Sequence, residues 1–366
     1  MKKKQLLLIT GGVLLLSLLF VPKMTFAQSG DDPVITNDLC LSCHVTSSMQ
    51  TELPSGESLY LTIDRDLFEG TEHSQIGYQC VQCHTDISGY PHPTNPATSI
   101  RDYSLQMYDL CSDCHQPKYD QTLDSTHQKA LAGGNENAAV CTDCHDPHYM
   151  TAPGEPRSNI GVMCQQCHSE IYGQYEESVH GGALINQGDP NVPICTDCHG
   201  VHDTTGPSSE GNFHLFSPLL CAECHNDDDL MSEYGVSTQV FETYIADFHG
   251  TTVLLFENTA PDQETNKPVC VDCHGVHNMK KVDDPESKVM KENLLETCQR
   301  CHPDATSNFP TSWLNHYQPT VDRHPLVYYV NLFYKLIIPV TIGGMLVFIA
   351  SDIWKKVSIK LEQKNE

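Results

Sequence analysis

Apolar residues gather at the two ends of this 366-residue chain. Residues 6–21 and 336–354 are nearly uninterrupted apolar runs, whereas glycine, proline, aspartate and asparagine are scattered through residues 28–325. Such punctuation disfavours long strands. The pattern predicts a mainly irregular and α-helical middle part between two segments of membrane type.

Within the middle part, short helices are expected at residues 236–249 and 288–298. Residues 251–269 are expected to form a loop. These are local expectations, and the periodicity of the chain alone does not say how the helices pack.

The first 27 residues have the parts of an export signal. Residues 2–4 are lysines, residues 6–21 are apolar, and Thr25-Phe26-Ala27 ends on a small residue, as a cleavage site requires. Thr25 departs from the usual Ala-x-Ala pattern, so a cleaved signal and a retained signal anchor both stay open. Either one implies export.

Residues 336–354 predict a transmembrane helix, with a buried helix of a soluble protein as the alternative. The run holds one charged residue, Asp352, and at 1.5 Å per residue it is about 28 Å long, enough to cross a bilayer core. We expect residues 326–334 at one interface and the basic tail, residues 355–366, in the cytoplasm. The sequence therefore predicts a C-terminal single-pass anchor in the cytoplasmic membrane, with residues 28–325 on the outer side.

The pattern Cys-x-x-Cys-His occurs nine times and uses all 18 cysteines. In this pattern the thiols form thioethers to a haem, and the histidine becomes the proximal iron ligand. The expected thioether cysteines are Cys40, Cys43, Cys80, Cys83, Cys111, Cys114, Cys141, Cys144, Cys164, Cys167, Cys195, Cys198, Cys221, Cys224, Cys270, Cys273, Cys298 and Cys301. The expected proximal ligands are His44, His84, His115, His145, His168, His199, His225, His274 and His302. The sequence thus predicts nine covalently bound haems c.

Other interpretations of Cys-x-x-Cys do not explain this count. Structural zinc sites pair two such knuckles and need no histidine after each. A thioredoxin-like motif occurs once, near a βαβ pattern. A disulfide framework would not place histidine after every second cysteine.

Residues 28–325 provide about 33 residues per motif. So short a chain cannot build a conventional apolar core around nine porphyrins, and the haems must form most of the core. The predicted fold is a haem-cored domain of short helices and loops.

The same part is strongly acidic, with 12 lysines and arginines against 44 aspartates and glutamates. Nucleic acid is therefore an improbable partner. The acid either keeps an exported domain soluble or faces a basic or metal-rich partner.

Four copies of a two-motif unit follow one another, each with two further histidines, and a ninth motif closes the series. The distal candidates from the copies are His73, His92, His127, His148, His180, His202, His249 and His277. Either His316 or His324 would supply the ninth ligand, and His214 is taken as a spare.

The spacing narrows which iron each candidate reaches. In Cys-x-x-Cys-His-x-x-His the last histidine leaves the chain on the same face as the proximal ligand, so it is expected to bind the iron of a neighbouring haem. The histidines of this kind are His148, His202 and His277. A second kind is expected to close either haem of its own copy, and the choice stays open. The histidines of this second kind are His127, His180 and His249.

The run of Cys-x-x-Cys-His motifs, with interleaved Ser-x-His and Cys-x-Asp-Cys-His-Gly-x-His, resembles the membrane-anchored multihaem cytochromes c of bacterial and archaeal respiration. The resemblance covers nearly the whole exported part and places the family's haem ligands on the nine motifs and on His148, His202 and His277. It implies electron transfer from a quinol-oxidising membrane partner to an exported or extracellular acceptor, whose identity the sequence does not define. Quinol-oxidising tetrahaem members carry an N-terminal anchor. The C-terminal anchor here favours a separate partner, such as a cytochrome b, docked by residues 336–354.

Two other functions stay open. One is an enzyme with one open haem that acts on nitrogen or sulfur oxyanions. Pentahaem nitrite reductases replace one motif histidine by lysine, and no motif here does so. The other is a quinol dehydrogenase in its own right, with Lys335, His324 and Tyr328 near the membrane surface.

Overall fold

The computed structural model describes residues 35–151, 154–206, 212–260, 267–312, 316–322 and 324–365. The predicted export signal, residues 1–27, lies outside the described residues.

The described chain is built from short helices and turns, as the punctuated sequence predicts. Its α-helices are α2 (Asn37–His44), α3 (Arg65–Glu69), α4 (Glu72–Gln75), α5 (Ile100–Met107), α6 (Ser112–Thr122), α7 (Thr126–Ala132), α8 (Cys141–Cys144), α9 (Asn159–Gln165), α10 (Ser169–Glu176), α11 (Val179–Gln187), α12 (Cys195–His199), α13 (Asn212–His225), α14 (Asp228–Tyr234), α15 (Val240–Ala246), α16 (Phe248–Thr259), α17 (Cys270–His274), α18 (Leu294–Gln299) and α19 (Pro325–Asn365). Short 3-10 turns are η1 (Cys80–Gln82), η2 (Tyr108–Cys111) and η3 (Pro310–Ser312). The strands β1 (Gln50–Glu52) and β2 (Ser58–Tyr60) form an antiparallel pair. The predicted mainly irregular and α-helical class is confirmed.

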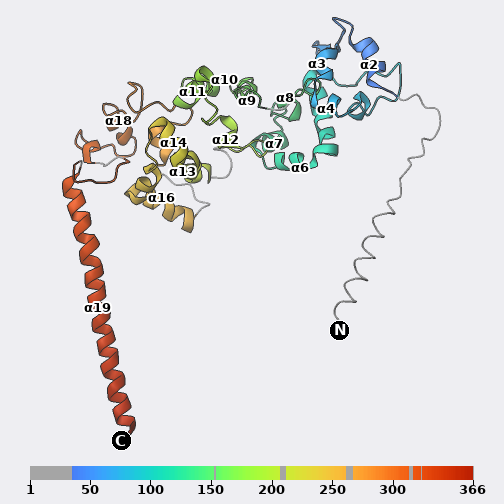
Figure 1. Ribbon diagram of the computed structural model, residues 1–366. Helices are drawn as coiled ribbons and strands as arrows, with labels where there is room; N and C mark the ends of the chain where they lie inside the picture. The colour runs from blue at the N-terminus through green and yellow to red at the C-terminus, as the bar shows by residue number, and fades with distance from the viewer. Residues whose placement is uncertain are drawn as a thin grey trace, which may run out of the picture.

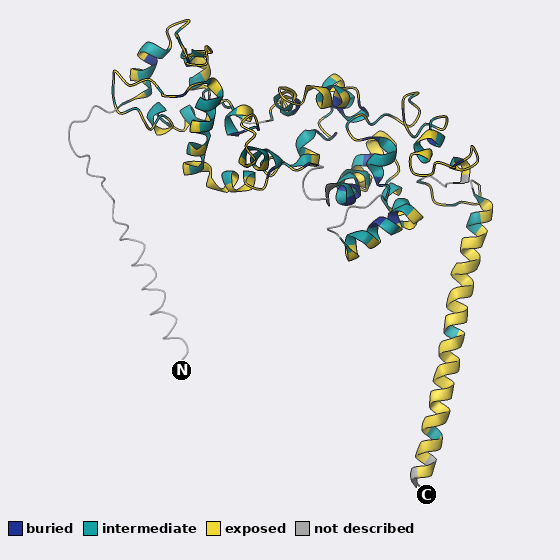
Figure 2. Cartoon of the chain, turned by 180° about the vertical axis from the view of Figure 1, so that it is seen from behind, coloured by how far each residue is buried: buried dark blue, intermediate teal, exposed yellow. Residues whose placement is uncertain are grey.

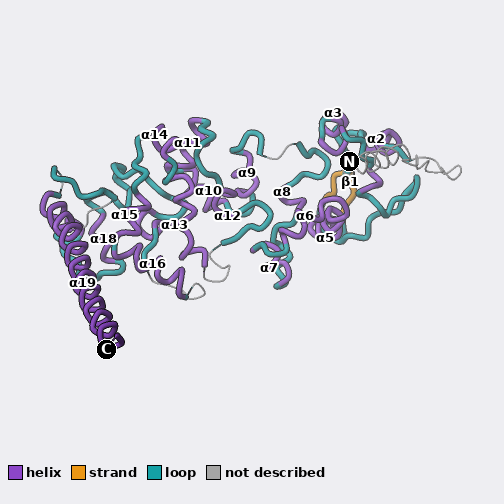
Figure 3. The backbone as a smooth tube through the Cα atoms, turned by 60° about the horizontal axis from the view of Figure 1, so that its bottom comes forward, coloured by secondary structure: helices purple, strands orange, loops and turns teal. Residues whose placement is uncertain are grey.

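The elements follow one another along an elongated body in the order of the sequence. Helices α2, α3 and α4 lie at one end, α7, α8 and α9 in the middle, and α18 near the other end (Figure 1). The same order is visible from a second direction in Figure 3. The first and the ninth cysteine motifs therefore lie at opposite ends of the body.

The apolar core is small, as the few residues per motif predict. One cluster of buried side chains consists of Tyr175, Leu184, Val192 and Ile194. A second consists of Leu215, Val253 and Val269. Most other side chains of the body are half-buried or exposed (Figure 2). These clusters sit beside the cysteine motifs and hold only the local backbone in place.

The loop predicted at residues 251–269 is wrong for its first half. Helix α16 continues to Thr259, because Asp247 caps its N-terminus and Val253 packs against Leu215 in a buried cluster. Tertiary packing of one apolar residue here outweighs the β-branched and polar residues that disfavour a helix. The expected helices at residues 236–249 and 288–298 correspond to α15 with the start of α16, and to α18.

Helix α19 leaves the body as one continuous rod of 41 residues, about 61 Å long at 1.5 Å per residue. Within Pro325–Leu361 an 18-residue window has a mean hydropathy of 2.1, and none of that window is buried against the protein. The interfacial segment, membrane span and basic tail expected from the sequence thus form a single helix, and Pro339 does not end it. By length and composition this helix is able to cross a bilayer.

Candidate haem-binding sites

The nine motifs are numbered here as sites 1 to 9 in chain order. No disulfide joins any of the 18 cysteines, which are half-buried or exposed. Each motif therefore keeps both sulfurs for thioether bonds.

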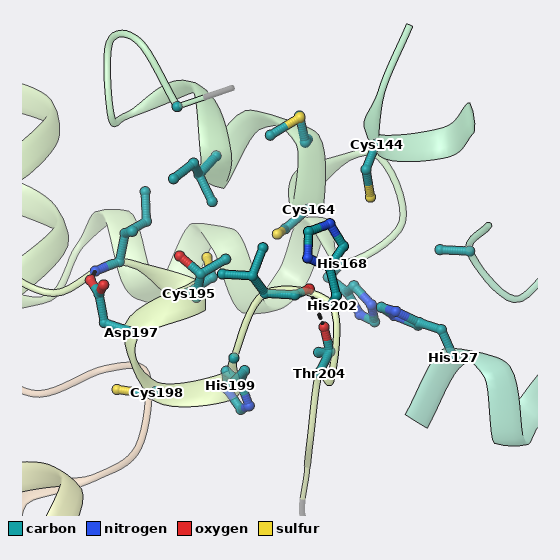
Figure 4. A pocket seen from close by; sticks show the side chains of 18 of the residues that line it. His127, Cys144, Cys164, His168, Cys195, Asp197, Cys198, His199, His202 and Thr204 are labelled. Atoms are coloured by element: carbon teal, nitrogen blue, oxygen red, sulfur yellow. Dashed lines mark hydrogen bonds between the residues drawn. The ribbon is translucent and has the colours of Figure 1, made fainter. Parts of the chain in front are cut away.

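The nine motif histidines each face one other histidine. The pairs are His44–His92 at 6.1 Å, His84–His148 at 6.0 Å, His115–His73 at 6.0 Å, His145–His202 at 6.2 Å, His168–His127 at 6.2 Å, His199–His277 at 6.0 Å, His225–His180 at 6.3 Å, His274–His316 at 6.3 Å and His302–His249 at 6.3 Å between ring centres. Figure 4 shows His127 on its helix, beside the segment that carries His168.

This spacing fits one iron between two imidazoles. Rings in direct van der Waals contact would lie closer together, whereas two ring nitrogens each about 2 Å from a shared metal put the ring centres about 6 Å apart. The narrow spread of the nine distances, 6.0 to 6.3 Å, matches that value in every pair. The residues present therefore fit nine haems with two axial histidines each.

The pairing interlocks the copies of the repeat. From site 3 on, every odd-numbered site takes its partner histidine from the preceding copy, as His225 does with His180. Sites 2, 4 and 6 take it from the copy that follows, as His199 does with His277. Site 8 takes His316, which follows the ninth motif. Site 1 has no preceding copy, and its partner, His92, comes from its own.

The structure corrects part of the predicted wiring. His127, His180 and His249 do not face either motif of their own copies but the first motif of the next one. The reason is that the extended body places the helix carrying each of them against the following copy. His148, His202 and His277 face a motif of the preceding copy, which agrees with the expectation that they reach a neighbouring site.

Of the three remaining histidines, one faces a motif histidine and two do not. His316 faces His274, so it takes the place for which His316 and His324 were alternatives. His324 lies outside the nine pairs and precedes α19, where its backbone carbonyl accepts a hydrogen bond from Tyr328 N–H. His214 is also outside the pairs, and its Nε2 lies 2.9 Å from Asp272 Oδ2.

A helix cap positions each histidine that pairs with a motif histidine further along the chain. The histidine is the second residue of its helix, and the residue before that helix accepts a hydrogen bond from a backbone N–H of the first turn. The capping residues are Thr71 for α4, Ser125 for α7, Ser178 for α11 and Asp247 for α16. Thr71, Ser125 and Ser178 are only 2%, 3% and 4% exposed. The sequence shows a recurring Ser-x-His, but its role as a helix cap becomes visible only in the structure.

Two glycines allow the closest packing of these helices. Gly181 follows His180, and a Cβ atom there would lie 1.9 Å from the carbonyl oxygen of Tyr175. Gly250 follows His249 and is confined in the same way by Tyr244, at 2.1 Å. A His-Gly pair in two of the copies was the available signal for these positions, and sequence reasoning missed it.

Backbone hydrogen bonds fasten three of the four capped helices, α4, α7 and α11, to the copy that follows. The donor is the residue between the cap and the histidine, and the acceptor lies two residues beyond the Cys-x-x-Cys-His-x-x-His sequence. The bonds are Glu72 N to Met150 O at 3.2 Å, Thr126 N to Thr204 O at 2.8 Å and Val179 N to Met279 O at 2.7 Å. The partner histidines of sites 2 and 3, of sites 4 and 5, and of sites 6 and 7 therefore sit on segments that are bonded together.

Neighbouring motifs adjoin through their sulfurs. Within each copy the first cysteines of the two motifs lie within hydrogen-bond reach of each other: Cys40 and Cys80, Cys111 and Cys141, Cys164 and Cys195, Cys221 and Cys270. Between copies the second cysteine of one motif lies near both cysteines of the next, as Cys198 does with Cys221 and Cys224. The nine sites consequently stand in single file.

Burial favours the neutral form of ten of the paired imidazoles. Burial, with the facing imidazole as a smaller cause, lowers the pKa of His180 and of His274 to about 4. The pKa is also lowered, chiefly by burial, for His84, His127, His145, His148, His202, His225, His277 and His316. The neutral form carries the lone pair that binds a metal, so the sites hold their histidines ready as ligands.

A connected cavity of about 3340 Å³ runs through the body, lined by the motif histidines of sites 1 to 8 and by all nine partner histidines. It is several times larger than the roughly 300–1,000 Å³ of a pocket for one small ligand. Within the described part of the chain, no three His, Cys, Asp or Glu side chains gather around a point where a bare metal ion would bind. This space suits large planar groups better than zinc ions.

Comparison with known proteins agrees with this geometry. Residues 66–146 match the model described as "Cytochrome c7 and related cytochrome c", and residues 129–172 match the model described as "Doubled CXXCH motif". The chain is a multihaem c-type cytochrome that binds haem covalently through its Cys-x-x-Cys-His motifs.

Among curated proteins, the chain is similar to the multiheme cytochrome MtrA of Shewanella baltica (strain OS185), with 23% identity over 281 residues. That alignment covers 75% of this chain and 66% of the relative, so the chain spans just under two thirds of the relative's length. No solved structure matches.

Replacing Ser178 by alanine is expected to lower the free energy of unfolding by about 1 kcal/mol, the usual value of an N-cap. Its hydroxyl accepts from Gly181 N–H at 3.0 Å and donates to Tyr175 O at 2.6 Å, and both bonds are buried. Denaturant unfolding followed at the Soret band measures the change. Ser169→Ala, at an exposed serine, is the control. Equal stabilities of the two variants would show that the cap contributes nothing.

Proposed function

We propose that the protein carries electrons through nine c-type haems, each with two axial histidines, arranged in single file between the membrane and a distal acceptor. Bound haem supplies the one-electron Fe(III)/Fe(II) couple. The observation that carries the proposal is the set of nine histidine pairs at 6.0 to 6.3 Å, one for each motif. A pair that occupies both axial positions leaves no coordination site for a substrate, so these residues favour electron transfer over catalysis.

The direction of the file supports a role as a wire. Site 9 lies at the end of the body from which α19 extends, and site 1 lies at the opposite end (Figure 1). With α19 in the cytoplasmic membrane and the basic tail inside, the body lies on the outer side, where haem is attached to such motifs. Electrons then enter near site 9 from a quinol-oxidising partner such as a cytochrome b, and leave near site 1.

The two alternative functions make different demands. An enzyme that reduces nitrogen or sulfur oxyanions needs one site without a second axial ligand, whereas each motif histidine here has a partner ring. A quinol dehydrogenase in its own right needs a quinol site near site 9. His324 precedes α19 and lines the large cavity, but no further observation favours quinol binding there.

Low-temperature EPR of the air-oxidised, detergent-solubilised protein tests the proposal, with haem content measured by the pyridine haemochrome method. We expect nine haems per chain, only low-spin ferric signals, and spectra that do not change on addition of nitrite or cyanide. A high-spin signal that shifts with added ligand would mean that one haem has an open coordination site. The protein would then be assigned as an enzyme and not as an electron carrier.

Removal of α19, by a stop codon in place of Pro325, is expected to release the protein from the membrane with its haem content unchanged. The reason is that, among the described residues, α19 is the one helix long and apolar enough to cross a bilayer, and its most apolar window is not buried against the body. Ultracentrifugation of washed membranes and haem staining of both fractions measure the release. Haem that stays in the membrane fraction would show that a second anchor, such as a retained signal, holds the protein.

A further inference from the structure

Four motifs carry an aspartate at the position before their second cysteine. In three of them, those with Asp143, Asp197 and Asp272, the aspartate has two roles. The first is to accept a hydrogen bond from the backbone N–H of the residue ahead of the motif, which fixes the first turn. These bonds are Val140 N to Asp143 Oδ2 at 2.7 Å, Ile194 N to Asp197 Oδ2 at 2.6 Å and Val269 N to Asp272 Oδ2 at 2.7 Å. The three motifs are those of sites 4, 6 and 8.

The second role is to contact a basic side chain. That side chain lies in the segment that comes before the motif of the previous site. At sites 4, 6 and 8 the same carboxylate oxygen contacts Arg101, Arg157 and His214 respectively. Arg101 Nη1 lies 2.8 Å from Asp143 Oδ2, and His214 Nε2 lies 2.9 Å from Asp272 Oδ2. Each aspartate thus holds a basic group directly beside a haem-binding motif.

The two arginines make the same additional contacts. Arg157 donates through Nη1 to the carbonyl oxygens of Pro190 at 2.8 Å and Val192 at 2.6 Å, which lie five and three residues before Cys195. Arg101 donates to the carbonyl oxygens of Glu136 and Ala138, which lie five and three residues before Cys141. A guanidinium offers several donors in a fixed plane, which suits three acceptors at once. The arrangement is therefore a repeated device and not a chance surface contact.

Stability alone does not account for this device. Arg157 and Asp197 have side chains that are 32% and 40% exposed, and ion pairs with that exposure contribute little to folding. The charges are significant because of their place: Asp197 directly precedes Cys198 and lies two residues from His199. An unbalanced charge that close to a haem iron changes its reduction potential.

Site 2 offers a natural contrast. Gln82 takes the place of the aspartate and accepts from Gln79 N–H at 2.6 Å, so it fixes the first turn in the same way. The Gln82 amide carries no charge, so no basic side chain is needed to balance it. The backbone role and the charge are thus separable within this one chain.

We propose that Arg101 and Arg157 are positioning residues that hold the motif aspartate and balance its charge, and so set the reduction potentials of the haems at sites 4 and 6, and that His214 holds the aspartate of site 8 in the same place by a hydrogen bond. The inference rests on the proposed function, because it requires haem at those sites. It assigns a role to His214, which pairs with no motif histidine.

Site 6 provides the test, with the full-length variants Arg157→Gln and Asp197→Asn and the variant with both changes. Potentials come from redox titration followed by EPR and visible spectra. Loss of the arginine leaves a bare carboxylate, which stabilises the ferric form, so one haem should shift to lower potential. Loss of the carboxylate should shift the same haem to higher potential. The double variant should return near the unmodified value, and Arg157→Lys, which keeps the charge, should shift less than Arg157→Gln.

Shifts of the two single variants in the same direction, with the largest shift in the double variant, would overturn the inference, because a purely structural role predicts that pattern. Unchanged potentials in all variants would overturn it as well. Haem content and spin state are read first on the unmodified protein, so a missing or high-spin haem there contradicts the proposed function separately. Arg101→Gln and Asp143→Asn give the same opposite shifts at site 4 where a site 6 variant does not mature.

Discussion

The variant His180→Ala is expected to convert one low-spin haem into a high-spin haem that binds cyanide or carbon monoxide. His180 is the ring that faces His225 at site 7, so its removal leaves that motif histidine without its partner ring. The planes of these two rings are rotated by 60°, the largest angle among the nine pairs. Strongly rotated axial imidazoles give low-spin EPR signals with an unusually large g value. The variant should therefore lose that signal and gain a high-spin one.

His214→Ala is the matched control, because His214 faces no motif histidine and bonds Asp272 instead. It should keep nine low-spin haems. Ligand titrations followed by EPR and visible spectra separate the two variants. If the haems of His180→Ala also stay low-spin and bind neither cyanide nor carbon monoxide, His180 is not the second axial ligand at site 7.

Loss of the haem at site 6 is expected to cut electron transfer along the chain. The double variant Cys195→Ser/Cys198→Ser removes both thioether bonds in the middle of the file, where site 6 adjoins site 5 through Cys164 and site 7 through Cys221 and Cys224. Because neighbouring motifs adjoin in sequence order along the elongated body, we expect no second route to bypass site 6.

Voltammetry of the protein held by α19 in a bilayer on an electrode measures this cut. At fast scan rates only the haems of sites 7, 8 and 9 should respond in the site 6 variant, although the haemochrome assay finds eight haems. The control Cys40→Ser/Cys43→Ser removes the terminal haem at site 1 and should leave all eight remaining haems responsive. Equal responses of the two variants would show that the sites do not act in series.

The candidate sites were largely readable from the sequence, because attachment of haem c needs a short, contiguous motif. Two cysteines and a histidine within five residues carry their chemistry without help from the rest of the fold. The repeat also reveals which further histidines recur with the motifs. The repeat does not show which motif histidine His127, His180 or His249 faces. Their partners lie outside their own copies, and the local sequence does not define how neighbouring copies pack.

The caps, the glycines and the charged contacts needed the structure for the same reason. Ser178 and Gly181 are ordinary residue types, and their role follows from the carbonyl of Tyr175 that packs against them. Arg157 and Asp197 are 40 residues apart, and only the folded chain brings them together. In the acidic sequence they are two charges among many.

The chemistry of this protein follows from its amino-acid sequence: covalent haem at Cys-x-x-Cys-His motifs, a chain too short per motif for a large apolar core, and an apolar C-terminal helix. Each of these depends on residues that are close in the chain or on simple composition. The folded chain was needed to show which histidines face each other, that the sites stand in single file, and that site 9 shares an end of the body with α19. Those features depend on how successive copies stack, and stacking is set by buried caps and backbone bonds between segments far apart in the sequence.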